Sequence, residues 1–371
     1  MKKITDIFDL KGKRVIVRAS LNIPLAHGTI RNAFRLKRAL STLRYLHEQG
    51  AKTIIIGHIG REPEETLKPV FLELEKHFPI HWGGVITSDE FKQRAALIND
   101  GTFLMAENLR QDKREEENDI DFATYIAQFG DIYINDAFAE AHREHASLSA
   151  LARILPAYAG FNLLDEVEHL QKVMVPKHPS LFLIGGAKFE TKMPLIEKYL
   201  NVYDFVFVGG ALANDIFKAK GYEVGTSLVS KVSLNGAPFL LSEKLLIPLD
   251  VIVDGPSGVR TCTPTEVQAD EKILDCGKAT TTMLATYIKE AATILWNGPF
   301  GNYEAGFKES TETTMRNLAA SKAFSVVGGG DTVAAIEELG LNESIGFVSI
   351  GGGAMLTYLE TGSTAVLDTL D

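Results

Sequence analysis

Runs of glycine followed by charged or hydroxyl residues are the first feature of this chain that could do chemistry. The stretch FSVVGGGDTVAAIEELG (324–340) joins an apolar segment to three glycines, then to Asp331, Thr332 and a helical pattern. A strand that ends in glycines before a helix gathers backbone N–H groups and the positive end of the helix at one point, which favours an anion. A tight turn capped by Asp331 or Thr332 would explain one such stretch. A second, FVSIGGGAMLTYLE (347–360), favours anion binding.

A pair of lysines follows another glycine run, in LFLIGGAKFETKMPLIEKYL (181–200). Lys188 and Lys192 are four residues apart, which predicts that both ammonium groups lie on one helix face near its N-terminus. Two lysines are unfavourable there, because the helix dipole prefers acids in its first turn. The alternative is a pair of solvated surface lysines. The preceding glycines favour neutralisation of a bound anion.

Further strands of the same half also end in glycine, in VFVGGALAND, DVIVDG and LWNGPFGNYE, the last with Pro299 and Glu304 beyond it. Each alone could be a turn. With GGGDT they are expected to line one edge of one sheet. Asp331 is then the natural carboxylate for Mg²⁺ held between phosphate oxygens.

Arginines in the first half stand at strand ends or helix starts. Arg18, Arg35, Arg61, Arg110 and Arg143 can therefore converge on one crevice. Guanidinium forks match the geometry of carboxylates and phosphates. A lone histidine is more often structural, but histidine beside arginine at a strand end, as at His58 and His142, suits a phosphorylated acid. No Ser-His-Asp or Cys-His set and no metal-ligand spacing is visible, so the chemistry needs positioning and charge.

Composition divides the chain and excludes several classes. Twelve of the fourteen arginines lie in 1–160, whereas twenty-two of the 32 glycines follow Gly160. A formal charge of −10 argues against a general nucleic-acid binder. The sequence lacks both the phosphate-loop and the dinucleotide-binding fingerprints. No long apolar run and no signal-peptide pattern is present, so we expect a cytoplasmic protein without a membrane partner. Cys262 and Cys276 lie in unrelated contexts.

Short strand-like runs alternate with helical patterns along the whole chain, which predicts parallel sheets with helices on both faces. A clear helical pattern covers 34–49, with Gly50 as its stop. Residues 155–180 hold three prolines, one helical stretch and no predicted strand, so we expect a connector there. The strand-like runs are RVIVRA, KTIIIG, TFLMAE, DIYIND, SLFLIGG, DFVFVGG, LDVIVDG, TILWNG, FSVVGGG and GFVSIGG.

Taken in order, these motifs resemble those of phosphoglycerate kinases through nearly the whole chain. The matching motifs are RASLNIP, GHIGRE, AENLR, INDAFAEAHREHAS, IGGAKFETK, WNGPFGNYE and VGGGDTVAA. The resemblance implies an α/β fold of two Rossmann-like three-layer domains with parallel sheets, joined by an interdomain helix and separated by a cleft. The implied domains are an acid-binding domain at 1–160, a helix or hinge at 161–178 and a nucleotide domain at 179–357, with a tail at about 358–371 that packs on the first domain.

The resemblance also implies an activity: reversible phosphoryl transfer between MgATP and the carboxylate of 3-phosphoglycerate, in glycolysis, by a monomer that binds small molecules. Arg35 and Lys192 are the implied catalytic residues, and Asp331 is the implied Mg²⁺ ligand. The implied acid-binding residues are Ser20, Leu21, Asn22, Arg35, His58, Ile59, Gly60, Arg61, Arg110 and Arg143. The implied ATP- or ADP-binding residues are Gly186, Lys188, Lys192, Gly209, Gly210, Asn297, Pro299, Glu304, Gly329, Gly330, Asp331 and Thr332.

Two departures from the family pattern bear on the substrate. Ser20 stands where the family has an aspartate that contacts the hydroxyl end of the substrate, and Ala139 and Glu140 replace a Gly-Thr pair. Serine is shorter and uncharged, so weaker binding or looser selection of the acid is expected. Two alternatives therefore stay open: a relative that phosphorylates another small acid, and a non-catalytic nucleotide-binding relative. Retention of four residues argues against the second: Arg35, Lys188, Lys192 and Asp331.

Overall fold

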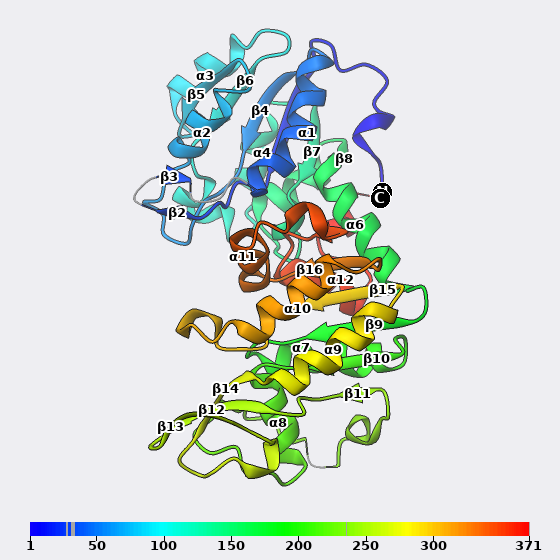
Figure 1. Ribbon diagram of the computed structural model, residues 1–371. Helices are drawn as coiled ribbons and strands as arrows, with labels where there is room; N and C mark the ends of the chain where they lie inside the picture. Colours follow the sequence, from blue (N-terminus) through cyan, green and yellow to red (C-terminus); the bar gives the residue numbers. More distant parts are fainter. Residues whose placement is uncertain (27–28, 31–33, 235, 371) are drawn as a thin grey trace. The chain divides into compact units, whose positions relative to one another are not determined.

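The computed structural model describes residues 1–26, 29–30, 34–234 and 236–370 (Figure 1). It divides into two compact units. The first unit contains Met1–Glu168 and Thr361–Asp371, and the second contains His169–Glu360. The chain passes from one unit to the other within helix α6 (Phe161–Met174) and again at the end of helix α12 (Gly353–Thr361). Each unit is built around its own parallel sheet.

The first unit is built on a six-stranded parallel sheet with the order β5-β6-β4-β1-β7-β8. β1 lies between β4 and β7, so the carboxyl ends of these strands lie side by side. The strands are β1 (Arg14–Ala19), β4 (Lys52–Ile56), β5 (Ile80–Gly84), β6 (Phe103–Ala106), β7 (Ile132–Asp136) and β8 (Ala157–Ala159), with a separate hairpin of β2 (Leu25–Ala26) and β3 (Thr29–Ile30). The helices that precede α6 are α1 (Phe34–Glu48), α2 (Lys68–Leu74), α3 (Asp89–Ala96), α4 (Ile120–Ala127) and α5 (Leu151–Ile154).

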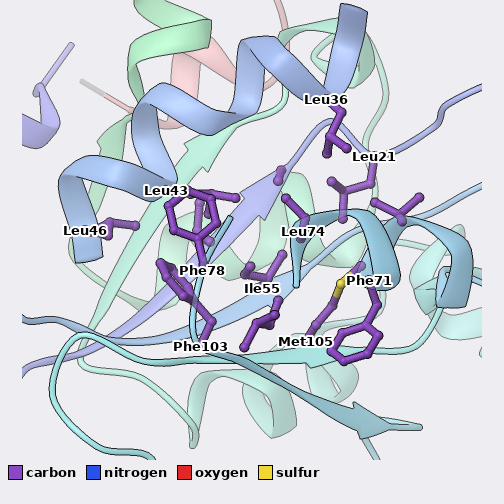
Figure 2. Packing of buried hydrophobic residues seen from close by; sticks show 14 of the residues in the cluster. Leu21, Leu36, Leu43, Leu46, Ile55, Phe71, Leu74, Phe78, Phe103 and Met105 are labelled. Atoms are coloured by element: carbon purple, nitrogen blue, oxygen red, sulfur yellow. The ribbon is translucent and has the colours of Figure 1, made fainter. Parts of the chain in front are cut away.

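One face of this sheet is packed by α1 and α2. Leu36, Leu43 and Leu46 of α1 follow helical spacing and join Phe71 and Leu74 of α2 in one buried cluster (Figure 2). Side chains alternate between the faces of a strand, so Val15 and Val17 of β1 enter this cluster. Arg18 must then point to the opposite face. That alternation brings a guanidinium into the interior of the unit.

The second unit has its own six-stranded parallel sheet, in the order β11-β10-β9-β15-β16-β17. Its strands are β9 (Ser180–Ile184), β10 (Phe205–Val208), β11 (Leu245–Leu246), β15 (Thr293–Asn297), β16 (Phe324–Gly328) and β17 (Phe347–Val348). A three-stranded antiparallel sheet is formed by β12 (Val251–Gly255), β13 (Gly258–Cys262) and β14 (Lys272–Cys276). The helices that precede α12 are α7 (Phe189–Leu200), α8 (Ala211–Ala219), α9 (Lys278–Glu290), α10 (Glu309–Ala319) and α11 (Gly330–Glu338).

Two details differ from the sequence prediction. The DVIVDG run forms β12, which belongs to the antiparallel sheet and not to the parallel edge with the other glycine runs. The connector was expected to lack a strand, but Ala157–Ala159 form β8 at the edge of the first sheet. Both misreadings have one cause, because a short apolar run does not state which sheet it joins. The helix expected at 34–49 is confirmed as α1.

Candidate active site

Four strand ends form a single row in the second unit. Ile184 of β9 pairs in register with Val208 of β10 and with Asn297 of β15, and Asn297 pairs with Gly328 of β16. Each of these strands is followed at once by a glycine-containing turn and, in three cases, by a helix that begins beside it. Ligands on parallel sheets bind at such carboxyl ends. The register therefore places the glycine runs of 185–186, 209–210 and 329–330 along one edge.

These turns are bonded to one another through the backbone. The Gly185 N–H donates to the Asn297 carbonyl at 2.9 Å, and the Gly186 N–H donates to the Pro299 carbonyl at 2.8 Å. A Cβ on Gly185 would lie 2.2 Å from the Pro299 oxygen, so no side chain fits there. Gly329 has φ +102°, a backbone conformation that glycine adopts at little cost. Glycine at 185 is required by packing, whereas glycine at 329 is required by conformation.

Lys192 lies in the first turns of α7 and is 8% exposed. Its Nζ donates to the Gly185 carbonyl at 2.5 Å. Burial lowers the pKa of Lys192 to about 8, against the opposing effect of the nearby Asp331 carboxylate, while Lys188 lowers it further. Lys188 is the N-cap residue of α7 and is exposed. The two lysines are thus near neighbours, but one is buried at the strand ends and the other faces solvent.

The buried side chains of Thr332 and Asn297 contact residues at this row of strand ends. The Thr332 hydroxyl, which is fully buried, accepts a hydrogen bond from the Gly298 N–H at 3.0 Å. The Asn297 amide is also buried and lies 3.8 Å from the Met355 sulfur. Gly329 is the N-cap of α11, so neither Asp331 nor Thr332 takes the capping role that a simple turn would give them. Asp331 stands in the first turn of α11.

A cavity of about 330 Å³ opens beside these residues in the second unit. The predicted residues that line it are Gly186, Gly210, Pro299, Glu304 and Asp331. Its walls also include apolar side chains such as Phe217 and Leu228, and the carboxylate of Asp275. A polar, glycine-lined end and an apolar end together suit a ligand with a charged tail and a flat, uncharged ring system.

Asp275 is a member of this cavity wall that the sequence did not indicate. It is 2% exposed and accepts hydrogen bonds from the Ser310 hydroxyl and from the Cys276 N–H, the latter at 2.8 Å. Burial raises the pKa of Asp275 to about 6. Its partners are Ser310, in the first turn of α10, and its own neighbour Cys276, so it fixes the start of that helix against β14. A single aspartate at a strand end carries no sequence signal for this role.

In the first unit, a cluster of cationic side chains surrounds His58. Arg18 Nη2 donates to His58 Nδ1 at 2.8 Å. Burial lowers the pKa of His58 far below its ordinary value, and the positive charges of Arg18, Arg110 and Arg143 lower it further. The imidazole is therefore neutral with its proton on Nε2, because arginine can only donate. Nε2 is buried and has no hydrogen-bond partner among the described residues.

Arg18 has a structural role that the sequence prediction missed. Its side chain is fully buried, donates from Nε to the Ser147 hydroxyl at 3.0 Å and donates from Nη1 to the Ala19 carbonyl at 2.6 Å. Ser147 in turn donates to the buried Glu115 carboxylate at 2.6 Å. Arg18 was expected in the crevice with the other arginines. Its buried guanidinium instead donates to His58 Nδ1, so Arg18 is a residue that positions His58.

The loops that follow β1 and β4 are joined by Asn22. Its side-chain oxygen accepts from the Gly60 N–H at 3.0 Å, and its carbonyl accepts from Arg35 Nη1 at 3.0 Å. Arg110 donates to the Gly60 carbonyl and forms an ion pair with Glu116 at 3.1 Å. These bonds bring residues from three separate segments to one end of the sheet.

Four more residues of the predicted acid-binding set are Arg61, Arg143, Leu21 and Ile59. Arg61 is exposed, and its backbone N–H donates to Glu65. Arg143 is half-buried and its Nε lies 3.5 Å from the His142 ring. Leu21, which Figure 2 labels, and Ile59 are buried in the same apolar cluster, so they can offer a ligand only their backbone.

Ser20 and Glu140, the two departures noted in the sequence, are in contact. The Ser20 hydroxyl donates to Glu140 Oε2 at 3.0 Å, and the two residues are 1% and 3% exposed. Glu140 therefore points into the unit and not away from it.

Comparison with known proteins decides the family. The family model described as phosphoglycerate kinase matches residues 4–362. The chain is 36% identical to the phosphoglycerate kinase of Maricaulis maris over 100% of this chain and 98% of that protein. It is 39% identical to the enzyme of Herpetosiphon aurantiacus over 94% of each. The chain belongs to the phosphoglycerate kinase family.

Solved structures agree with this assignment. The phosphoglycerate kinase from Coxiella burnetii superposes with a TM-score of 0.84 at 34% identity, covering 99% of this chain and 98% of that one. The enzyme from Pyrococcus horikoshii OT3 gives a TM-score of 0.87 at 30% identity, covering 100% and 98%. The resemblance seen in the motifs, the α/β class with two parallel sheets and the expectation of a phosphotransferase are thereby confirmed. Among the described residues, no helix has the length and apolar character needed to span a bilayer.

Proposed function

We propose that this member of the phosphoglycerate kinase family transfers the γ-phosphoryl group of MgATP reversibly to the carboxylate of 3-phosphoglycerate, giving 1,3-bisphosphoglycerate and MgADP. The observation that carries the proposal is the row of strand ends in the second unit, where glycine turns, Lys192 and Asp331 meet beside a 330 Å³ cavity. Backbone N–H groups and helix starts at strand ends suit phosphates. We assign ATP and ADP to this edge.

The acid is assigned to the first unit, where Arg35, Arg61, Arg110 and Arg143 supply guanidinium groups for its phosphate and carboxylate. The unpartnered Nε2–H of His58 supplies one more donor, held in place by Arg18. The backbone around Asn22 and Gly60 orients these side chains. This division gives each unit one anionic reactant.

The residues present fit a magnesium ion. Asp331 offers a carboxylate at the start of α11 in the cavity wall, close enough to Lys192 to affect its pKa. No cluster of three or more acidic, histidine or cysteine side chains suited to a metal occurs among the described residues. One carboxylate plus nucleotide phosphates is a common donor set for Mg²⁺. The ion, held by Asp331 when bound, would neutralise charge on the phosphate oxygens.

The remaining chemistry comes from the chain itself. Both reactants are anions, so the protein must offset their repulsion and stabilise charge on the migrating group. Lys192, with a pKa of about 8, is protonated in most molecules at pH 7 and is held at the strand ends by Gly185. Arg35 supplies charge from the side of the acid. Transfer between the reactants also requires that water be kept out.

We further propose that the protein acts as a cytoplasmic monomer in glycolysis. The family assignment supports the pathway, and a net charge of −10 disfavours self-association. Light scattering during gel filtration tests the monomer directly: a mass near 40.6 kDa is expected, and twice that mass would refute it.

A steady-state assay of the purified protein with MgATP tests the activity, with ADP release as the readout. Glycerate and 2-phosphoglycerate serve as comparison acids. Turnover with 3-phosphoglycerate alone is the expected result. Turnover with another of these acids would establish an altered substrate, and tight MgADP binding without turnover would establish a non-catalytic relative.

A further inference from the structure

Ser20 and Glu140 come from neighbouring strand ends of the first unit. Ser20 directly follows β1, and Glu140 ends the short helix η4 (Phe138–Glu140) that follows β7. Ala19 and Asp136, the last residues of these strands, pair in register. The hydrogen bond of 3.0 Å between the two side chains therefore lies at the edge to which the acid is assigned.

The charge of Glu140 is felt within the cationic cluster. Burial lowers the pKa of both Arg110 and His142, and the carboxylate of Glu140 opposes that shift in each of them, so it lies near both side chains. After burial, the positive charge of Arg143, the residue that follows His142, lowers the pKa of Arg110 further. A nearly buried carboxylate thus lies among the groups assigned to a substrate that has two anionic groups. Its charge repels the ends of such a substrate, and its burial is unfavourable unless donors reach it.

A carboxylate can only accept hydrogen bonds, and this one already accepts a hydrogen bond from the Ser20 hydroxyl. Because the hydroxyl proton of Ser20 is used in that hydrogen bond, the Ser20 oxygen offers a ligand only its lone pairs. The two groups therefore form a pair of acceptors. Between its carboxylate and its phosphate, 3-phosphoglycerate carries one donor, the hydroxyl on carbon 2. Glu140 is 3% exposed, and the hydroxyl is the smallest polar group of this substrate.

We propose that Glu140, positioned by Ser20, accepts a hydrogen bond from the substrate hydroxyl and selects a 2-hydroxy acid over its deoxy analogue. This inference rests on the proposed function. Selection arises because binding an acid without the hydroxyl costs free energy: the buried oxygens of Glu140 and Ser20 are then left without a hydrogen-bond donor. An analogue that lacks the hydroxyl would remove water from Glu140 and give nothing in return, while keeping the charge repulsion.

Glu140→Met tests the inference, because methionine keeps a similar length and removes both acceptor oxygens. The probes are 3-phosphoglycerate and 3-phosphooxypropionate, its 2-deoxy analogue, compared by kcat/KM. We expect the variant to lose about 10- to 100-fold on 3-phosphoglycerate, the range of a hydrogen bond to a charged group. With the deoxy analogue it should be unchanged or better, since a repelling charge is gone. Glu144→Met, at an exposed carboxylate four residues away, is the matched control and should leave the ratio unchanged.

A second variant guards against a general loss of folding. This variant combines Ser20→Asp with Glu140→Ala. It removes the carboxylate at position 140 and places one at position 20, at the end of β1. We expect the pair to recover most of the preference for the hydroxy acid, whereas Ser20→Asp alone places two carboxylates in contact and should impair both substrates. Equal losses on both acids in Glu140→Met, or an unchanged ratio, would overturn the inference while leaving the proposed function in place. No turnover of either acid by the unchanged protein would refute both.

Discussion

The two units approach the same problem, an anion at the carboxyl ends of parallel strands, with different chemical groups. In the first unit, side chains from several segments gather around His58, and their placement depends on buried braces such as Arg18. In the second unit, the groups are Lys192 and the backbone at helix starts beside glycine turns, whose positions follow from sheet register. Side chains can recognise one acid among many, whereas backbone donors fit any phosphate chain. The contrast suits one reactant that must be selected and one that shares its phosphates with other nucleotides.

Removing the guanidinium of Arg35 should give the largest effect, and it tests the contrast between the two units most directly. We expect Arg35→Ala to lower kcat about 1000-fold, the upper range for loss of one preorganised donor to the migrating charge. The affinity for MgADP should change little, because Arg35 bonds to Asn22 within the first unit. Stopped-flow turnover and calorimetric titration with MgADP measure the two quantities.

Arg44→Ala is the control for this change, because Arg44 is an exposed arginine of the same helix α1. It should behave as the unchanged protein in both measurements. A parallel loss of kcat and MgADP affinity in Arg35→Ala would contradict the assignment of this arginine to the acid alone.

Lys192 provides a second test of the contrast between the two units, because it is the one predicted catalytic side chain in the second unit. Its folded pKa of about 8 lies below the ordinary 10.5, so the folded state holds the proton less strongly than the unfolded chain. The charged form therefore destabilises the fold below pH 8, and this cost fades as the pH rises from about 8 to 10.5. Lys192→Met should raise the free energy of unfolding at pH 7 by roughly 2–4 kcal/mol while abolishing most activity.

Urea unfolding of both proteins at pH 7 and at pH 10 measures this effect. The stability advantage of the methionine variant should shrink at the higher pH. A variant that is less stable at pH 7, or an advantage that does not depend on pH, would show that the bond to Gly185 outweighs the cost of burial.

Sequence patterns predicted the glycine turns at the strand ends of the second unit better than the side-chain contacts of the first unit, for a physical reason. Glycine runs after apolar segments mark strand ends directly, and parallel register then brings them together without further information. Arg18 shows the limit: strand alternation turns its side chain to the inside, but the sequence does not state that Ser147 accepts its hydrogen bond there, or that Glu115 accepts one from Ser147 in turn. The Ser20–Glu140 contact joins residues 120 positions apart. The sequence around either residue does not predict contact with the other, because the contact depends on β1 and β7 being neighbours in the sheet.

The same limit applies to strands that join other sheets. β12 reads as one more buried strand ending in glycine, yet its partners β13 and β14 run antiparallel to it. Asp275 enters the cavity wall from β14, a strand that the apolar pattern did not reveal. Short strands with mixed side chains carry weak periodic signals, so their sheet membership is set by tertiary packing.

The smallest expected effect separates glycines that serve the fold from glycines that serve a ligand. A Cβ on Gly330, the first residue of α11, would meet nothing within 4 Å, and alanine is favoured over glycine inside a helix by up to about 1 kcal/mol. Gly330→Ala should therefore unfold no more easily than the unchanged protein. Its MgADP dissociation constant should nevertheless rise about tenfold, the equivalent of roughly 1.4 kcal/mol, because the methyl group occupies space that the phosphates need beside the helix start. Gly185→Ala, whose methyl group would meet the Pro299 carbonyl, should instead lose stability and affinity together. Unchanged MgADP affinity in Gly330→Ala would mean that the phosphates do not approach α11, and the assignment of this helix start to the nucleotide would fall.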